Sequence, residues 1–166
     1  VTIRSLLAHA SGLAAWRPLY AEAADRSRAL AFLLNEPVAE ALTATYSDLG
    51  FMLLGAIVER VAAERLDLFA AREVFAPLGM ATARFGPNVP PPVAPTEDCG
   101  WRNRLLVGEV HDENAWVWDG VAGHAGLFVT ADDLVAYARA WLRYEPHLGS
   151  RSLLGDAVAE QAVGPE

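Results

Sequence analysis

The chain has 166 residues, of which 53% are hydrophobic, and its formal net charge is -8 at pH 7. This length is enough for one domain with a buried core, so we expect residues 1–166 to form a single domain. The charge argues against a nucleic-acid partner, because no basic stripe is present to displace counterions from phosphates. The longest apolar run, about ten residues, is shorter than the roughly 20 residues that a transmembrane helix needs. We therefore expect no transmembrane segment within this chain.

Residue types that are missing or scattered narrow the chemistry further. All thirteen basic residues are arginine and none is lysine, so every catalytic motif that requires lysine is absent from this sequence. The four histidines lie far apart, and neither an H-E-x-x-H motif nor a Cys/His cluster occurs, so we expect no metal site. A phosphate-binding loop and a dinucleotide fingerprint are also missing, and we expect no cofactor. The single cysteine, Cys99, cannot form an internal disulfide.

The ends of the sequence indicate a piece of a longer protein. It begins at Val1, with neither a methionine nor a signal-peptide pattern, so its localisation cannot be taken from it. No internal repeat and no linker divides the 166 residues. We expect a fragment of one larger domain.

Apolar residues at helical spacing predict helices in the first half of the chain. Residues 2–9 form a short helix capped by Thr2, and residues 22–34 form a second helix. The inward face of the second helix is expected to carry Leu30, Leu33 and Leu34. A further helix over residues 66–75 follows the most apolar segment of the chain.

That most apolar segment, Leu49 to Val58, predicts a helix buried on most faces. Ser47 is a good N-cap, and Asp48 then lies in the first turn, where a negative charge complements the helix dipole. A phenol at Tyr46 would lie at the positive end of this helix and ionise more easily, as a general base requires. The alternative is structural: Tyr46 and Phe51 have the spacing of a hydrophobic staple, and Asp48 only complements the dipole.

Glycines and prolines organise the second half. Gly50 and Gly55 on the buried helix predict the close approach of another backbone. Residues 83–99 contain five prolines and predict a long loop, of the kind that often borders a binding site. Two short strands are expected, over residues 104–110 and 127–129, with a glycine-punctuated turn over residues 120–126 between them.

Thr130 caps another predicted helix, with two aspartates in its first turn. Its core face is expected to carry Leu134, Val135, Ala138 and Leu142. A weaker helix is predicted over residues 152–163. The chain as a whole is thus expected to be mainly α-helical with a few short strands.

Four segments, taken together, resemble one family. They are Ile3-Arg4-Ser5-Leu6-Leu7-Ala8-His9-Ala10-Ser11-Gly12-Leu13, Tyr46-Ser47-Asp48-Leu49-Gly50-Phe51, Phe75-Ala76-Pro77-Leu78-Gly79-Met80 and residues 123–134. In this order they resemble the I-R-x-L-L-x-H-x-S-G-L, Y-S-N, F-x-P-L-G-M and G-G-L-x-S-T-A-x-D-L segments of penicillin-recognising serine hydrolases. That family includes class C β-lactamases, D-alanyl-D-alanine carboxypeptidases and related esterases. The resemblance implies the helical middle portion of an α+β β-lactamase/transpeptidase-like fold.

The resemblance also implies roles for individual residues. Tyr46 matches the tyrosine that shuttles a proton between the nucleophile and the leaving group, and Asp48 stands where the family usually has asparagine. An ionised aspartate cannot donate a hydrogen bond as that amide does, although it would pair more strongly with the motif lysine. His124 and Gly126 form the only H-x-G, a candidate for the substrate-binding K-T-G motif; the alternative is that His124 is a turn histidine.

The first functional interpretation is therefore part of a serine hydrolase that cleaves amide or ester bonds of a small-molecule or peptide-like substrate through an acyl-enzyme. Without lysine the chain holds neither the S-x-x-K nucleophile motif nor K-T-G, so alone it is predicted to be inactive. Two alternatives stay open: a non-catalytic penicillin-binding-like sensor or scaffold, and an unrelated helical interaction domain. The family resemblance would suit a periplasmic or secreted protein. An unrelated helical domain predicts no exposed apolar surface, whereas a portion of a larger fold predicts one.

Overall fold

The computed structural model of the chain describes residues 1–40 and 44–143. Contacts between residues divide the chain into two compact units. Unit 1 comprises Val1–Leu66 and Phe85–Leu127, and unit 2 comprises Asp67–Arg84 and Phe128–Glu166. The expectation of a single domain stays a prediction. The described residues are mainly helical with a few short strands, as the sequence predicted.

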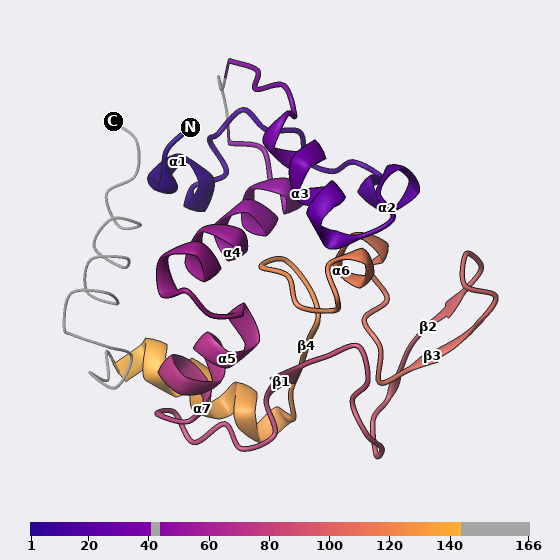
Figure 1. The fold of residues 1–166 in the computed structure, drawn as a ribbon. Coiled ribbons are helices and arrows are strands. Elements are labelled where there is room, and N and C mark those ends of the chain that lie inside the picture. The colour runs from indigo at the N-terminus through magenta and orange to yellow at the C-terminus, as the bar shows by residue number, and fades with distance from the viewer. Residues whose placement is uncertain (41–43, 144–166) are drawn as a thin grey trace. The chain divides into compact units, whose positions relative to one another are not determined.

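Unit 1 holds most of the secondary structure (Figure 1). Its helices and its longer strands are α1 (Ile3–Leu7), α2 (Leu19–Glu22), α3 (Arg26–Leu34), α4 (Asp48–Ala62), β2 (Pro95–Cys99), β3 (Arg104–Val107) and α6 (Glu113–Val117). Helix α4 contacts α1 and α3, and α2 contacts α3 and α6. Buried side chains of α2, α3, α4 and α6 and of the segments beside them form one core, made of Leu19, Ala23, Ala29, Leu33, Leu49, Met52, Val110, Ala115, Val117, Trp118 and Ala122.

Helix α4 begins where its sequence predicts. The Ser47 side chain accepts a hydrogen bond from the Gly50 amide at 3.1 Å, and Asp48 is the first helical residue. Every residue from Asp48 to Glu59 is buried or half-buried, which confirms a helix covered on most faces. A central buried helix of this kind fixes the position of the residues that lead into it.

The helix predicted over residues 22–34 begins four residues later, as α3, and the separate short helix α2 precedes it. The chain is extended at Ala23, and Asp25 then caps α3 by accepting from the Arg28 amide at 2.9 Å. Because this side chain satisfies the free amides of a new helix, α3 starts at Arg26 rather than continuing from residue 22. The predicted inward face is partly wrong, since Leu33 is buried but Leu34 is exposed.

The proline-rich segment is more ordered than a loop. Residues 95–99 form β2, which pairs antiparallel with β3 in a two-stranded sheet. Pro95 is tolerated because it is the first residue of the strand. Earlier in the segment, the Val89 amide donates to the Gly108 carbonyl at 2.7 Å. The prediction of one long loop over residues 83–99 is therefore wrong, while the strand predicted after it is confirmed as β3.

Two very short strands, β1 (Arg84–Phe85) and β4 (Leu127–Phe128), form a second two-stranded sheet. They lie where the chain passes from one unit to the other along the sequence. The strand predicted over residues 127–129 is thus confirmed. Helix α5 (Leu66–Ala70) lies where the chain first passes from unit 1 to unit 2. The π-helical segment Ala71–Phe75 continues it, which confirms the helix predicted over residues 66–75.

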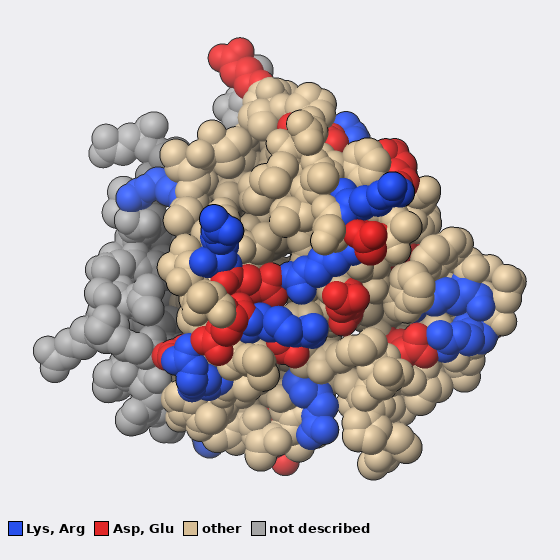
Figure 2. Space-filling view, in the orientation of Figure 1, with Lys and Arg blue, Asp and Glu red and all other residues tan. Residues whose placement is uncertain are grey.

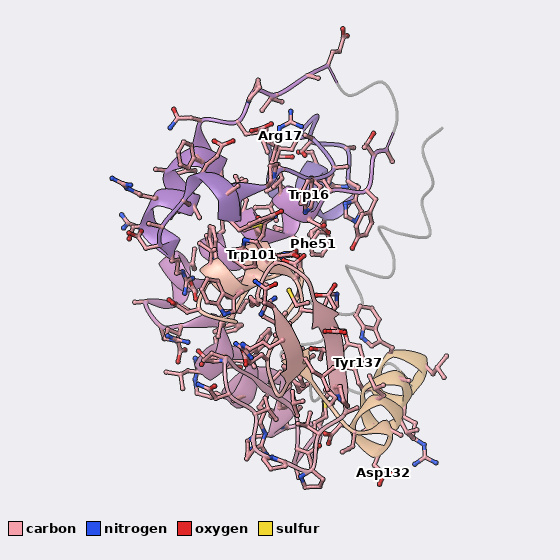
Figure 3. All side chains as sticks on the ribbon, turned by 90° about the vertical axis from the view of Figure 1, so that its right-hand side faces the viewer. Trp16, Arg17, Phe51, Trp101, Asp132 and Tyr137 are labelled. Carbon is pink, nitrogen blue, oxygen red and sulfur yellow. The ribbon has the colours of Figure 1, made fainter. Side chains whose placement is uncertain are left out.

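The main element of unit 2 is α7 (Ala131–Arg143), on which Figure 3 labels Asp132 and Tyr137. The predicted core face of this helix is wrong: Leu134, Val135 and Leu142 are exposed, the last to 81%. Asp133 and Ala140 are buried instead, and Asp133 accepts a hydrogen bond from the Thr82 hydroxyl. The helix predicted over residues 152–163 lies outside the described residues.

Charges are mixed on the face drawn in Figure 2, where acidic and basic side chains lie interspersed. Among residues 1–40 and 44–143, none of the helices combines the length and the hydropathy that a membrane span requires. Apolar side chains form the core of unit 1, and others are exposed on α7.

Candidate active site

Tyr46 presents its side chain to solvent at the start of α4, with 69% of its surface exposed. The backbone on both sides of it is held by unit 1. The Thr45 amide donates to the His9 carbonyl at 2.9 Å, and the Asp48 amide donates to the Ala15 carbonyl at 2.9 Å. The phenol is thus free while the backbone that carries it is fixed.

Ser47 is the anchor of this segment. It is buried, and its hydroxyl donates to the Ala14 carbonyl at 2.7 Å while accepting from the Gly50 amide. One side chain therefore caps α4 and also joins it to the segment that follows α1. We call residues 45–48 the Tyr46 segment.

His9 contacts the Tyr46 segment with both its backbone and its ring. Its Nδ1 accepts a hydrogen bond from the Ser47 amide at 3.0 Å, so the proton of a neutral ring lies on Nε2. The ring centroid lies 4.6 Å from that of Tyr46 and 4.9 Å from that of Phe51, which is labelled in Figure 3. Both rings of the expected staple therefore contact His9.

The sequence reasoning missed His9 as a positioning residue, because a histidine next to Ser11-Gly12 reads as a helix end. Its backbone is in the left-handed region, with φ of 54°. This conformation turns the chain after α1 and places the His9 carbonyl and ring against the Tyr46 segment. The signal that could have found it is the position of His9 inside the H-x-S-G-L segment.

Asp48 is half-buried in the first turn of α4, as predicted. Its carboxylate forms no hydrogen bond or ion pair with any residue that the structure describes. A free carboxylate two residues from an exposed phenol is available to a cation from elsewhere. This arrangement is compatible with the pairing to a lysine that the family resemblance implies.

The glycine turn (residues 120–126) lies directly on α4. A Cβ on Gly123 would be 2.0 Å from the Phe51 carbonyl oxygen, and a Cβ on Gly55 would be 3.0 Å from the Gly123 nitrogen. The predicted close approach of a backbone is confirmed at Gly55, whereas Gly50 faces side chains. The contact lies roughly one and a half to two and a half helical turns beyond Tyr46 along α4.

His124 in this turn faces inward. Only 3% of its side chain is exposed, and its Nε2 lies 2.9 Å from Asp112 Oδ1. An ionised carboxylate only accepts hydrogen bonds, so Nε2 carries the proton. The other ring nitrogen, Nδ1, is buried without a partner among the described residues. This geometry favours a turn histidine, and the substrate-binding role of His124 stays a prediction.

Asp112 serves two elements at once. Its Oδ1 also accepts from the Ala115 amide at 2.7 Å and so caps α6. Burial would raise the pKa of Asp112, but the hydrogen bonds from His124 and Ala115 outweigh it and hold the pKa below its ordinary value. The carboxylate is therefore held in its charged form between α6 and the glycine turn.

Gly126 ends the turn with a φ of 107°, a conformation that side chains rarely adopt. A Cβ there would lie 2.3 Å from the Gly120 carbonyl oxygen, so the turn closes on itself. Of the four residues predicted for the site, Tyr46 and Asp48 thus adjoin at the start of α4. His124 and Gly126 belong to the turn that packs further along the same helix.

The chain belongs to the β-lactamase family, whose model matches residues 1–165. It is 36% identical over 137 residues to the N-acetylmuramyl-L-alanine amidase of Bacillus subtilis (strain 168), a match that covers 71% of this chain and 31% of the relative. The chain therefore spans about a third of that protein's length.

Solved structures show the same fold. The octameric penicillin-binding protein homologue from Pyrococcus abyssi matches with a TM-score of 0.70 at 21% identity, covering 93% of this chain and 37% of that one. The D-amino acid amidase of Ochrobactrum anthropi SV3, complexed with D-phenylalanine, matches with a TM-score of 0.62 at 19% identity, covering 93% and 47%. The expected helical portion of a penicillin-binding or β-lactamase fold is confirmed, and the unrelated helical domain is excluded.

Proposed function

We propose that Tyr46 is the proton-transfer residue of a serine hydrolase that cleaves amide or ester bonds through an acyl-enzyme. The observation that carries the proposal is the combination of an exposed phenol with a backbone fixed on both sides by hydrogen bonds to residues 9 and 15. A catalytic group must be accessible to substrate and held in one position. A residue of a hydrophobic staple would instead bury its ring.

In this proposal, the nucleophile belongs to a part of the parent protein outside these 166 residues. A serine of the S-x-x-K type needs a lysine, and this sequence has none. The exposed apolar face of α7 supports the same proposal, because a portion of a larger fold leaves surface that other parts of that fold cover. The 166 residues alone are accordingly predicted to lack hydrolase activity.

Asp48 bears on the substrate. The carboxylate has no partner among the described residues, so we propose that it pairs with the lysine of the nucleophile motif. It cannot donate to a substrate carbonyl as an asparagine amide would. An amide substrate, such as the name of the Bacillus subtilis relative implies for that protein, fits the family and is the class that we propose.

The test uses the longer parent protein and a chromogenic ester or amide substrate. Tyr46→Phe is expected to lower kcat by about 10²–10⁴-fold, the usual contribution of general acid–base catalysis, with little change in folding. Tyr20→Phe is a matched control, because it removes a phenol from the same unit at a ring that packs against Trp16 and Trp101. Full activity in Tyr46→Phe would contradict the proposal.

A non-catalytic sensor or scaffold is the second candidate, and the departure at Asp48 is the observation that favours it. Measuring substrate turnover by the parent protein distinguishes the two functions. A scaffold would show no turnover with either Asp48 or Asn at this position, whereas the hydrolase turns over with Asp48 and changes its substrate preference in Asp48→Asn. Activity in the isolated 166 residues would contradict the proposed origin of the nucleophile.

A further inference from the structure

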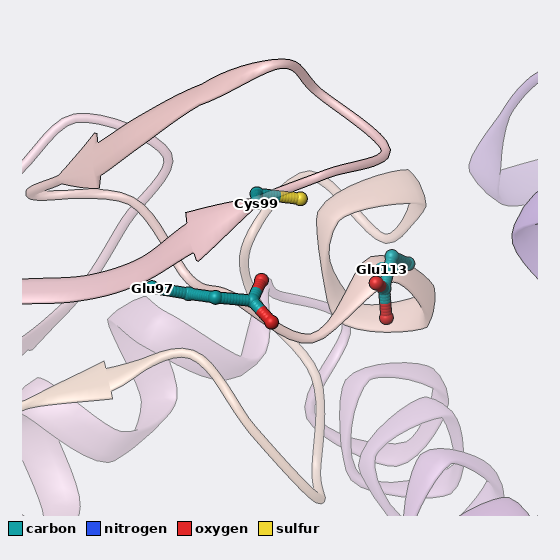
Figure 4. Close-up of side chains that lie close together, drawn as sticks. All are labelled: Glu97, Cys99 and Glu113. Carbon is teal, nitrogen blue, oxygen red and sulfur yellow. The ribbon is translucent and has the colours of Figure 1, made fainter.

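Three side chains of types that can bind metals lie close together between β2 and α6 of unit 1 (Figure 4). They are Glu97, Cys99 and Glu113; one carboxylate oxygen of each glutamate and the thiol sulfur all lie within 4.8 Å of one another. Glu97 and Cys99 are two residues apart on β2 and so point to the same side of the strand, while Glu113 is the first residue of α6. We call these residues the Glu–Cys–Glu cluster. No histidine takes part, which is why a search for histidine spacing does not detect it.

Hydrogen bonds link the two elements that carry the cluster. Arg102, in the turn between β2 and β3, donates from its guanidinium to the carbonyls of Val110 and His111, the residues that lead into α6. Its guanidinium also lies over the rings of Trp101 and Trp116, at 5.7 and 5.8 Å from their centroids. The turn of the hairpin is thereby tied to the start of α6, which brings the donors from the two elements together.

The thiol of Cys99 is buried and hydrogen-bonded. Cys99 is only 2% exposed, and its sulfur accepts a hydrogen bond from the Arg102 amide at 3.4 Å. This contact fixes the position of the sulfur, and cysteine binds a metal as the thiolate. The buried sulfur is thus one donor of a group whose other two members reach it from more exposed positions.

The two carboxylates lack a cation. Neither Glu97 nor Glu113 forms an ion pair or a side-chain hydrogen bond with any residue in the described part of the chain. Arg104 is committed to Glu109 through two contacts of 2.5 and 2.7 Å, and Arg102 is committed to the carbonyls before α6. Two carboxylates beside a thiol repel each other unless a cation offsets their charge.

We propose that the Glu–Cys–Glu cluster binds one divalent cation of the zinc class. A thiolate selects zinc over magnesium or calcium, which take oxygen ligands alone. In a tetrahedral zinc site, with Zn–S about 2.3 Å and Zn–O about 2.1 Å, neighbouring ligand atoms lie about 3.5 Å apart. Donors that start within 4.8 Å reach this spacing with side-chain motions of about 1 Å, which the exposed Glu97 can make.

Three protein ligands leave a fourth position for water, and the ion would join β2 to α6. The proposal does not depend on the proposed hydrolase function, because acyl transfer by a serine needs no metal. It adds a stabilising cross-link to unit 1, since an ion that binds only the folded chain raises its stability.

The test is a titration of the metal-free chain with Co²⁺, a spectroscopic substitute for zinc, followed by competition with Zn²⁺. We expect one Co²⁺ per chain, a thiolate-to-cobalt absorption band that Zn²⁺ abolishes, and a higher Tm with Zn²⁺. Glu97→Gln is expected to weaken binding by more than about 100-fold, because losing even an outer-shell partner of a metal costs about 10–100-fold.

Asp98→Asn is the matched control, since it makes the same charge change on the opposite side of β2 and is expected to leave binding unchanged. Cys99→Ser is expected to remove the absorption band. Because Cys99 is buried, circular dichroism checks whether Cys99→Ser still folds. If Cys99→Ser unfolds, the test rests on Glu97→Gln, whose side chain is exposed. A wild-type chain without the band, or equal weakening in Glu97→Gln and Asp98→Asn, would overturn the proposal.

Discussion

Helix α4 supports two regions in opposite ways. The Tyr46 segment before its first turn fixes its backbone through hydrogen bonds and leaves the side chain of Tyr46 exposed. The glycine turn, which packs against Phe51 and Gly55, fixes its backbone through close contact and buries the side chain of His124. An exposed side chain on an anchored backbone is suited to chemistry, and a buried one on a tightly packed backbone is suited to structure.

This comparison predicts that substitutions in the glycine turn change stability most, while those at Tyr46 change activity. The hydrogen-bonded Ser47 should lie between these extremes, because it anchors the exposed residue. The following variants separate packing, hydrogen bonding and charge.

Gly123→Ala is expected to have the largest effect on the free energy of unfolding. The added methyl group would lie 2.0 Å from the Phe51 carbonyl oxygen, so the turn must leave α4. We expect a loss of about 3 kcal/mol or more, at the upper end for overpacked sites. Urea denaturation followed by circular dichroism measures it. Gly100→Ala is the control, because a Cβ there meets no atom within 4 Å, and equal losses in both variants would refute the packing argument.

Ser47→Ala should cost about 2 kcal/mol. The variant loses the cap of α4 and leaves the Ala14 carbonyl without its donor in a buried position. The same denaturation experiment measures this loss, and Thr2→Ala provides the comparison, since it removes an exposed cap from the shorter α1. If Thr2→Ala lowered the free energy of unfolding as much as Ser47→Ala, the special role of Ser47 in anchoring the Tyr46 segment would be refuted.

Asp112→Asn tests the charge that holds the glycine turn. The folded-state pKa of Asp112 lies below its ordinary value, so the carboxylate contributes stability above the unfolded-state pKa of about 4. That contribution is lost as the pH falls through the lower, folded-state pKa. Asparagine caps a helix nearly as well as aspartate, so we expect a loss of about 1 kcal/mol at neutral pH. Unfolding measured from neutral to acidic pH should show wild type and variant converging, and parallel curves would contradict this.

Tyr46→Phe should have the smallest effect on stability, within about 0.5 kcal/mol, because the hydroxyl group is on an exposed side chain. Its ring contact with His9 is retained. Thermal unfolding of the variant checks this value. A large loss would mean that Tyr46 holds the fold together, and the contrast with the glycine turn would disappear.

The start of α4 could be predicted from the sequence because the residues that determine it lie within a few positions of one another. Ser47 caps the helix through an amide three positions away, and Asp48 follows directly. The contact at Gly55 was also foreseeable, since a glycine in a buried helix suggests a close neighbour. The sequence pattern could not identify the backbone that contacts Gly55, because Gly123 lies far along the chain.

Other features depend on distant residues and escaped prediction for that reason. The role of His9 arises from a left-handed backbone and from contacts 38 residues along the sequence. The face of α7 was predicted from the spacing of leucines, yet the structure buries Asp133 and exposes Leu134. The Glu–Cys–Glu cluster joins β2 to the first residue of α6, and Arg102 links the same two regions from a hairpin turn.

The hydrogen bond between Val89 and Gly108 divides the proline-rich segment into two shorter pieces. Gly108 has a φ of 72°, and a Cβ there would lie 2.1 Å from the Val89 carbonyl oxygen, so the two backbones lie in contact. A protease must bind several residues of an extended segment in its cleft. A segment whose central residue is hydrogen-bonded to another part of the chain is a poor substrate. Limited proteolysis should therefore leave residues 86–89 intact, and peptide tags inserted at residues 90–93 should be tolerated better than tags at Val89.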